Sequence, residues 1–345
     1  MPARIPARMK DIAQRLGVSV VTVSKALRGF PGPSEETRAR VLEVAKELNY
    51  EPNFAARALV SGHTYSIGLV IPDLVHPFFA QIAKSVSAVL NPLGYGLIVS
   101  SSEENPEIER RAVEQLVSRS VDGILIASTQ GSAEILRWLE EQGTPYVLVD
   151  RKFEGLQANF VGVDDVRVGV LATEHLIEMG CQRIAHIGGG RLSSALGRRE
   201  GYERTLASHG IQIYKEYVVL EEQIDIRAKG TGNAAARKLL DLNPRPDGIF
   251  CYNDPVAMGT LVTCLEAGLR IPEDIAIVGC GNSHYDDFLR VPLTSVDQKS
   301  ELIGQRAAEL AVRLIESPKA PPVQTQLLEP ELMVRKSSQR RLRPV

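Results

Sequence analysis

The sequence has few cysteines, no long hydrophobic run and little net charge, and each shortage excludes a class of protein. The four cysteines among 345 residues form no CxxC pair, which argues against a zinc site or a disulfide framework. Apolar runs such as 67–71 are far shorter than the ~20 residues that span a bilayer. No apolar stretch follows the basic residues of positions 1–10, so we expect no signal peptide and a cytoplasmic protein without metal or cofactor.

The net charge of −2 hides an uneven distribution along the chain. Residues 1–60 contain ten Lys/Arg and six Asp/Glu, a net charge of +4, and the remaining 30 Lys/Arg and 36 Asp/Glu give −6. A basic head on an acidic body favours a polyanionic partner for the head alone. At roughly 100–200 residues per domain, the length predicts two or three domains.

The first fifty residues have the pattern of three short helices. Residues 10–16 place apolar side chains on one face and end at Gly17, a turn residue. Ser19 is a suitable N-cap for a second helix over 20–27, and Ser34 for a third. Two helices of this length joined by a short turn containing glycine are typical of a helix-turn-helix.

The second helix carries side chains that suit DNA better than a protein surface. Val20 and Val21 would lie exposed at its start, where they suit the methyl groups of thymine in a major groove. The polar positions suit phosphate or base-edge contacts: Ser19, Thr22, Ser24 and Lys25. On spacing alone, a three-helix domain that packs on the body is an equal alternative.

Residues 53–60 form a second candidate DNA element. Pro52 is a favourable first residue for a helix, and the alanines around Ala56 keep the helix narrow. A helix this short is marginal in water, so we expect it to order only when held. Arg57 and an apolar wedge at Leu59 suit a minor groove. The alternative is an ordinary linker helix.

From Tyr65 onwards, short apolar runs alternate with amphipathic helical stretches. This βαβ rhythm predicts parallel sheets in an α/β domain, and so many strands favour two lobes over one sheet. Residues 150–163 lack helical periodicity and are predicted to cross between the lobes. The expected strands are 65–71, 96–100, 123–127, 146–150, 160–163, 183–188, 217–220, 248–252 and 275–279.

Short motifs spread along the chain occur in a characteristic order and spacing. They include 10–13, 17–20, 22–27, 48–53, 56–59, 66–70, 121–124, 150–151, 175–176, 183–185, Arg198, 201–202, 253–254, 257–259 and 331–335. Together they resemble the LacI/GalR family of bacterial transcription regulators over nearly the whole chain. The resemblance implies an α/β fold with a helix-turn-helix headpiece and hinge helix, followed by a two-lobed core like that of periplasmic binding proteins, with two Rossmann-like parallel sheets.

The resemblance also implies a function for each part. Residues 1–62 would bind DNA, with Val20, Val21 and Lys25 reading bases. Asn53, Ala56, Arg57 and Leu59 would belong to the hinge helix, with Ala56, Arg57 and Leu59 at the minor groove. Residues 63–345 would bind an effector and dimerise. The first lobe would comprise about 65–163 and 294–325, and the second about 164–293 and 326–340. A homodimer would repress from a near-palindromic double-stranded operator.

The effector, a sugar or sugar derivative, would lie between the lobes. Strand ends and family positions point to Phe78, Phe79, Asp150, Arg151, Arg198, Asn253 and Asp254. The alternatives are core packing for the two phenylalanines and a surface ion pair for Arg198. Gly281 stands where the family often has an aspartate that holds ligand hydroxyls, so one polar contact is missing.

Two other classes of protein fit the sequence less well. An enzyme is disfavoured because the glycines of 188–190 belong to no GxGxxG or P-loop pattern, and no nucleophile elbow is present. A sugar-binding protein without a DNA role would need neither the basic head nor its helix-turn-helix pattern.

Overall fold

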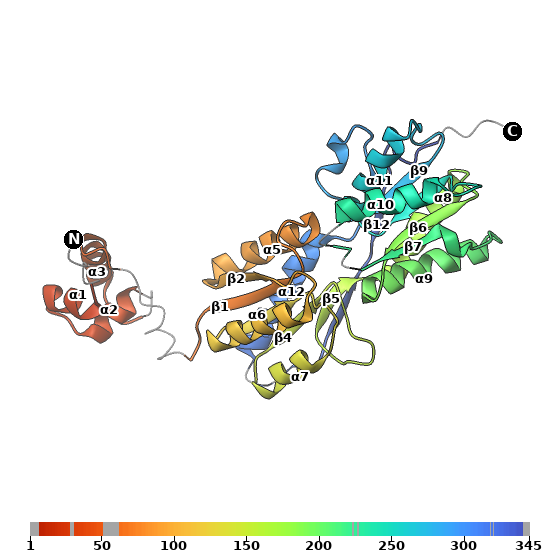
Figure 1. Ribbon diagram of the computed structural model, residues 1–345. Helices are drawn as coiled ribbons and strands as arrows, with labels where there is room; N and C mark the ends of the chain where they lie inside the picture. The colour runs from red at the N-terminus through yellow and green to blue at the C-terminus, as the bar shows by residue number, and fades with distance from the viewer. Residues whose placement is uncertain are drawn as a thin grey trace. The chain divides into compact units, whose positions relative to one another are not determined.

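The computed structural model divides the chain into two compact units, residues 1–64 and 65–345 (Figure 1). It describes residues 7–27, 31–50, 62–222, 224–225, 228–317, 319 and 321–340. The division falls two residues after the predicted limit at 62. The first unit is called the head below, and the second is called the core.

Three helices form the head: α1 (Met9–Leu16), α2 (Val20–Leu27) and α3 (Glu35–Glu47). Gly17 ends α1 with a φ of 66°, in the left-handed region. Ser19 and Ser34 cap the next two helices, because their hydroxyls accept the amides of Thr22 (3.0 Å) and Thr37 (3.2 Å). Ile12, Val23, Ala26, Val41 and neighbouring apolar residues are buried between the helices, so the three predicted helices are confirmed.

Two six-stranded sheets organise the core. The first has the strand order β11-β5-β4-β3-β1-β2, with every pair parallel. Its strands are β1 (Ser66–Ile71), β2 (Gly96–Ser101), β3 (Gly123–Ile126), β4 (Tyr146–Val149), β5 (Phe160–Val163) and β11 (Thr325–Leu328). Its helices are α5 (Pro77–Leu90), α6 (Pro106–Ser118), α7 (Glu134–Glu141) and α12 (Ser300–Glu316), with the short η1 (Asn91–Leu93) after α5.

The second sheet has the order β12-β10-β9-β8-β6-β7 and is parallel except for the β10–β12 pair. Its strands are β6 (Ile184–Gly189), β7 (Val218–Glu221), β8 (Gly248–Cys251), β9 (Ala276–Cys280), β10 (Thr294–Asp297) and β12 (Glu331–Met333). Its helices are α8 (Asp165–Glu178), α9 (Ser193–Ser208), α10 (Ala228–Leu240) and α11 (Asp254–Glu266), with the short η2 (Lys215–Tyr217) and η3 (Asp286–Phe288). Each sheet with its helices is one lobe.

All nine predicted strands are present, but the predicted crossing segment and two of the predicted lobe boundaries differ from the structure. Residues 150–163 do not cross, because β5 at their end pairs with β4 and β11 in the first sheet. Residue 294 begins β10, which pairs with β9 and stays in the second lobe. Residue 326 lies inside β11, which belongs to the first. The chain therefore crosses after β5, after β10 and after β11.

Two features are absent from the residues that the structure describes, namely a membrane-spanning helix and a cluster of metal ligands. No helix within these ranges is long and apolar enough to cross a membrane. The same residues contain no group of three His, Cys, Asp or Glu side chains placed to hold a metal ion. All four cysteines are buried as free thiols, and burial raises the pKa of Cys181 to about 12.

Candidate DNA-binding face and effector cleft

The outer face of α2 presents apolar side chains to solvent. Val21 is 64% exposed and Val20 is 42% exposed, whereas Val23 and Ala26 on the opposite face are buried. Two neighbouring exposed valines at a helix start are unfavourable in water unless something covers them. Lys25 is exposed one turn further along the same helix.

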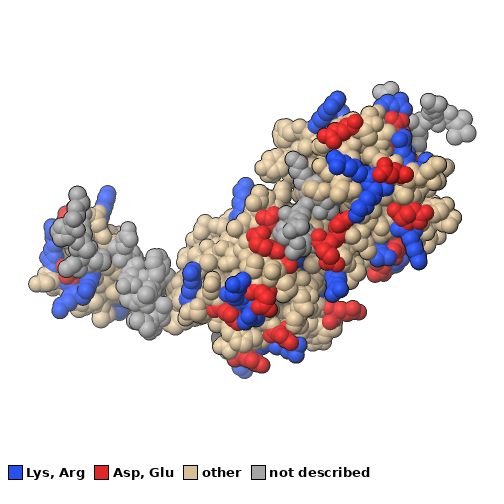
Figure 2. All heavy atoms as spheres, in the orientation of Figure 1, with Lys and Arg blue, Asp and Glu red and all other residues tan. Residues whose placement is uncertain are grey.

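The polar residues of α2 have mixed surroundings. The Ser19 hydroxyl lies 2.8 Å from that of Thr22 while it caps the helix, so both belong to the N-terminal turn. Thr22 and Ser24 are half-buried. Several Lys and Arg side chains lie on the face of the head drawn in Figure 2. The predicted hinge residues Asn53, Ala56, Arg57 and Leu59 fall outside the described residues.

Arg151 lies two residues after the end of β4 and is a fully buried cation. Its guanidinium is fully buried and lies 5.8 Å from the ring of Phe79. Its Nη2 donates to Asp225 Oδ2 at 2.5 Å and to Glu104 Oε1 at 3.0 Å, and its Nη1 donates to the carbonyl of Ser128 at 3.0 Å. Because Asp225 belongs to the second lobe and the others to the first, Arg151 joins the lobes.

Asp225 receives donors from both lobes. Its Oδ1 accepts from Asn253 Nδ2 at 2.8 Å and lies 3.6 Å from His76 Nε2, while Asn253 Nδ2 lies 3.2 Å from the same imidazole nitrogen. Burial is the largest influence on this carboxyl and would raise its pKa, but Arg151, His76, Arg198 and the Asn253 hydrogen bond together outweigh it, so the pKa is lowered. Asp225 is therefore the anionic centre of the cleft.

Arg198, on α9, has a carboxylate and an aromatic ring as partners. Its Nε donates to Asp165 Oδ1 at 3.0 Å, its Nη1 donates to the Tyr252 carbonyl at 2.7 Å, and its guanidinium lies 4.5 Å from the Tyr252 ring. Both Arg198 and Tyr252 are almost fully buried. The ion pair is therefore a buried one, unlike the surface pair considered from the sequence.

Asp150 and Glu104 add two carboxyls with altered acidity. Burial is the main cause that raises the pKa of each to about 7, and neighbouring carboxylates add to it. Asp150 lies 3.9 Å from Arg151 Nε and accepts from Gln298 Nε2 at 3.4 Å. The cleft therefore contains two groups that change charge near neutral pH.

Backbone amides also bond across the cleft. Gln130 Oε1, in the first lobe, accepts the amide of Ser193 at 2.6 Å, and the Ser193 hydroxyl accepts the amide of Lys152 at 3.0 Å. Glu109 holds the Gln130 loop by accepting from Ser128 and Thr129. These bonds require the lobes to be close together.

Asp254 follows Asn253 but belongs to a different cluster. Its carboxylate accepts the hydroxyl of Ser295 at 2.6 Å and the amide of Ser283 at 2.9 Å, and the buried Asp286 carboxyl lies near it. Burial and the charge of Asp254 raise the pKa of Asp286 to about 9, so this pair holds a proton at neutral pH. The cluster anchors the loop of residues 281–288.

The two phenylalanines differ in their surroundings. Phe79 is 1% exposed and packs edge-on against Phe78 (5.1 Å between centroids) and beside His76 (5.3 Å). Phe78 lines a pocket of about 680 Å³ between the lobes, outside the Arg151 cluster.

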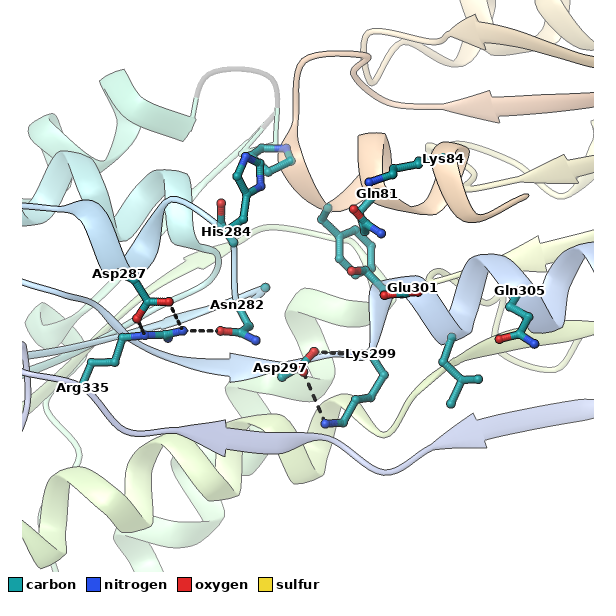
Figure 3. A pocket seen from close by; sticks show the side chains of 16 residues that line it. Gln81, Lys84, Asn282, His284, Asp287, Asp297, Lys299, Glu301, Gln305 and Arg335 are labelled. Carbon is teal, nitrogen blue, oxygen red and sulfur yellow. Dashed lines mark hydrogen bonds and ion pairs between the residues drawn. The ribbon is translucent and has the colours of Figure 1, made fainter. Parts of the chain in front are cut away.

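That pocket is polar, and most of its charges are already paired (Figure 3). Gln81 and Lys84 reach it from α5, while Asn282, His284 and Asp287 reach it from the second lobe. Arg335 bonds Asp287 and Asn282, and Lys299 bonds Asp297. Of the residues predicted to bind the effector, only Phe78 lines it.

The structure brings together Asp150, Arg151, Arg198 and Asn253, and it adds residues that sequence reasoning missed: Glu104, Asp225, Tyr252, His76 and Gln298. Asp225 follows the end of β7, so the strand-end rule that selected Asp150 could have found it. Nothing in the sequence shows that Glu104 would meet Arg151.

Comparisons with known proteins agree with this architecture. Residues 8–53 match the family model described as bacterial regulatory proteins, lacI family, and residues 173–338 match a periplasmic binding protein-like domain. The regulator CelR of Thermobifida fusca is 34% identical over 98% of this chain and all of its own length. The chain belongs to the LacI family.

Other LacI-family members support the assignment over the full chain. The regulator DegA of Bacillus subtilis is 31% identical over 95% of this chain and 97% of its own. The lac repressor dimer bound to operator and the anti-inducer ONPF has a TM-score of 0.82 at 26% identity, covering 97% and 99% of the two chains. A CelR–cellobiose complex has a TM-score of 0.73 at 31% identity, covering 96% and 99%. The protein is a DNA-binding transcription regulator with a ligand-binding core, and not an enzyme.

Proposed function

We propose that the protein is a cytoplasmic repressor that binds a near-palindromic operator as a homodimer and is controlled by a sugar or sugar derivative between its lobes. The observation that carries the proposal is the Arg151–Asp225 bond, because it joins the lobes inside the cleft. A molecule that replaced this bond would change the angle between the lobes. Coupling of about 1–3 kcal/mol between two sites is typical of such linkage.

The α2 face supports the operator part of the proposal. Val20, Val21 and Lys25 are all exposed on it, as contact with base edges requires. The relative with a solved operator complex is a dimer, and a dimer presents two such helices to two half-sites. We assign to Ser19, Thr22 and Ser24 the contacts with the DNA backbone that fix the position of α2 in the groove. We assign the minor-groove contacts to the hinge helix, with Asn53, Ala56, Arg57 and Leu59.

Exposed apolar side chains of the core support the homodimer. Val75 is 84% exposed and Phe288 is 86% exposed, and Leu74 and Tyr285 beside them are each 52% exposed. Apolar side chains that gather on a surface are commonly covered by a partner. A second copy of the chain is the partner that the operator geometry requires.

The effector site is assigned to the Arg151 cluster: Asp150, Arg151, Arg198 and Asn253, with Phe79 as its wall. Buried, convergent donors and acceptors from both lobes are what a small polar ligand needs. Phe78 and Asp254 lie beside this cluster and shape its outer wall. The 680 Å³ pocket is the second candidate, since residues of both lobes line it.

Two measurements test the proposal. Selection of bound sequences from random double-stranded DNA by the full-length protein should return a near-palindrome, and a non-symmetric or random result would contradict the operator assignment. A thermal-shift screen of sugars should identify a ligand, because binding to the folded state raises the apparent stability. Asn253→Ala should abolish that shift and Lys84→Ala should preserve it; the reverse result would move the effector to the 680 Å³ pocket.

A further inference from the structure

The cations of the cleft are already neutralised by the protein. Arg151 contacts two carboxylates, Asp225 at 2.5 Å and Glu104 at 3.0 Å, and Arg198 contacts Asp165 at 3.0 Å. Asp150 lies 3.9 Å from Arg151. Four carboxyls therefore surround two guanidinium groups, and none of the six side chains is more than 12% exposed.

Other titratable groups around the cluster do not restore a positive charge. Burial lowers the pKa of His76, so the imidazole beside Asp225 is neutral at pH 7. Lys152 has an exposed side chain at the edge of the cleft, where water screens its charge. Asp254 and Asp286 are carboxyls whose pKa values are both raised, so this pair adds no positive charge.

From this charge balance we infer that the effector is an uncharged polyhydroxylated molecule, that sugar acids and sugar phosphates are rejected, and that Glu104 is the residue that sets this preference. The inference rests on the proposed function and refines it.

Simple electrostatics explains the discrimination. An anionic group placed beside Arg151 would face Asp225 and Glu104 at a similar distance, in surroundings where burial strengthens repulsion. A hydroxyl group both donates and accepts, so it can take a bond from Asn253 and give one to Asp225 without adding charge. Selectivity of this kind comes from repulsion of the wrong ligand as much as from attraction of the right one.

Glu104 is the side chain best placed to enforce the preference. It shares Arg151 Nη2 with Asp225, so it occupies the position that a ligand carboxylate would take on that nitrogen. Arg151, which belongs to the same lobe, donates to it at 3.0 Å. Glu104→Gln keeps the shape of the side chain and removes its negative charge.

The experiment compares matched ligand pairs on the full-length protein by thermal shift and calorimetric titration: glucose with glucuronate, galactose with galacturonate, and cellobiose with cellobionate. We expect a neutral member to bind at least ~10-fold more tightly than its acid. Tighter binding of an acid would overturn the inference and leave a sugar-type effector intact. If no member of any pair bound, the proposed effector class itself would be wrong.

Glu104→Gln should reduce the neutral-to-acid ratio severalfold. Glu107→Gln is the matched control, because Glu107 lies nearby in sequence but is exposed and pairs with Arg110. Equal ratios in the two variants would remove Glu104 from the specificity role. Unliganded melting temperatures of both variants verify that each is folded.

Discussion

The proposed DNA-binding face of α2 and the proposed effector site around Arg151 are built in opposite ways. The face is apolar and exposed, with Val20 and Val21 in water and no rearrangement needed for contact. The cluster is polar and buried, and a ligand that bonds Arg151 Nη2 or Asp225 Oδ1 must replace a bond that exists. DNA affinity should therefore depend on the surface presented, and effector affinity on the balance between old bonds and new ones.

The largest effect is expected where the cluster loses its cation. Arg151→Ala leaves Asp225 and Glu104 buried without their shared partner, and breaking a buried pair in this way costs about 3–5 kcal/mol. Urea denaturation should show this loss in the free energy of unfolding of the core. A change below ~1 kcal/mol would mean that water already reaches the carboxylates.

The next effect concerns the DNA-binding face alone. Val21→Asp places a carboxylate where we expect base edges and phosphates, and we predict a loss of operator affinity of about 100-fold, since one mismatched contact costs roughly 1–3 kcal/mol before charge repulsion is added. Fluorescence anisotropy on the selected operator measures it. The thermal shift with the effector should not change, and a change there would contradict the independence of the two sites.

A substitution in the hinge tests the connection between the two regions. Leu59→Gly removes the proposed wedge and weakens a marginal helix, so specific operator affinity should fall while effector affinity of the core is unchanged. If the variant and the original protein bound the operator with equal affinity, Leu59 would not act as a wedge.

The pH dependence of stability isolates one group of the cluster. The pKa of Glu104 is raised to about 7, so the folded state holds an extra proton between about pH 4.5 and 7. Stability due to this group therefore decreases as pH rises through that window, by at most about 1.4 kcal/mol per pH unit. Urea denaturation at pH 5 to 8 gives the free energy of unfolding of the original protein and of Glu104→Gln, and the difference between them should decrease as pH rises. A difference that does not change with pH would mean that Glu104 titrates normally.

Lys25→Ala should have the smallest effect. A lysine that reaches a base edge or phosphate contributes roughly 1–3 kcal/mol, and its removal should weaken binding or relax sequence choice. Repeating the DNA selection with the variant separates the two outcomes. An unchanged affinity and an unchanged consensus would remove Lys25 from the contact set.

Local signals made the head and nine strands predictable. Caps at Ser19 and Ser34 and apolar periodicity act within a few residues, so α2 was placed at its observed limits. Strands β10, β11 and β12 were missed because none of them has an apolar run like those of the other strands: β10 is Thr-Ser-Val-Asp and β12 is Glu-Leu-Met. Half of β11 is exposed, and its sequence Thr-Gln-Leu-Leu has no buried run. Their sheet partners are distant in sequence, so only the folded chain assigns them to a lobe.

For the site, too, the sequence predicted which residues lie at strand ends but not their partners from distant parts of the chain. Strand ends selected Asp150, Arg151 and Asn253, but they do not say which carboxylate each meets. Asp254 also lies at a strand end, yet the tertiary structure directs it to Ser283 and Ser295. The pairing of Arg151 with Glu104 joins positions 47 residues apart and follows no local pattern.

Gly281 limits how the cleft could evolve. Its φ of 130° is one that residues with a Cβ rarely adopt, and an added Cβ would lie 3.0 Å from Asp254 Oδ2. An aspartate at this position would bring strain and a third carboxyl to the Asp254–Asp286 pair. A carboxylate that binds ligand hydroxyls could therefore be added to this part of the cleft only together with a compensating change in that pair.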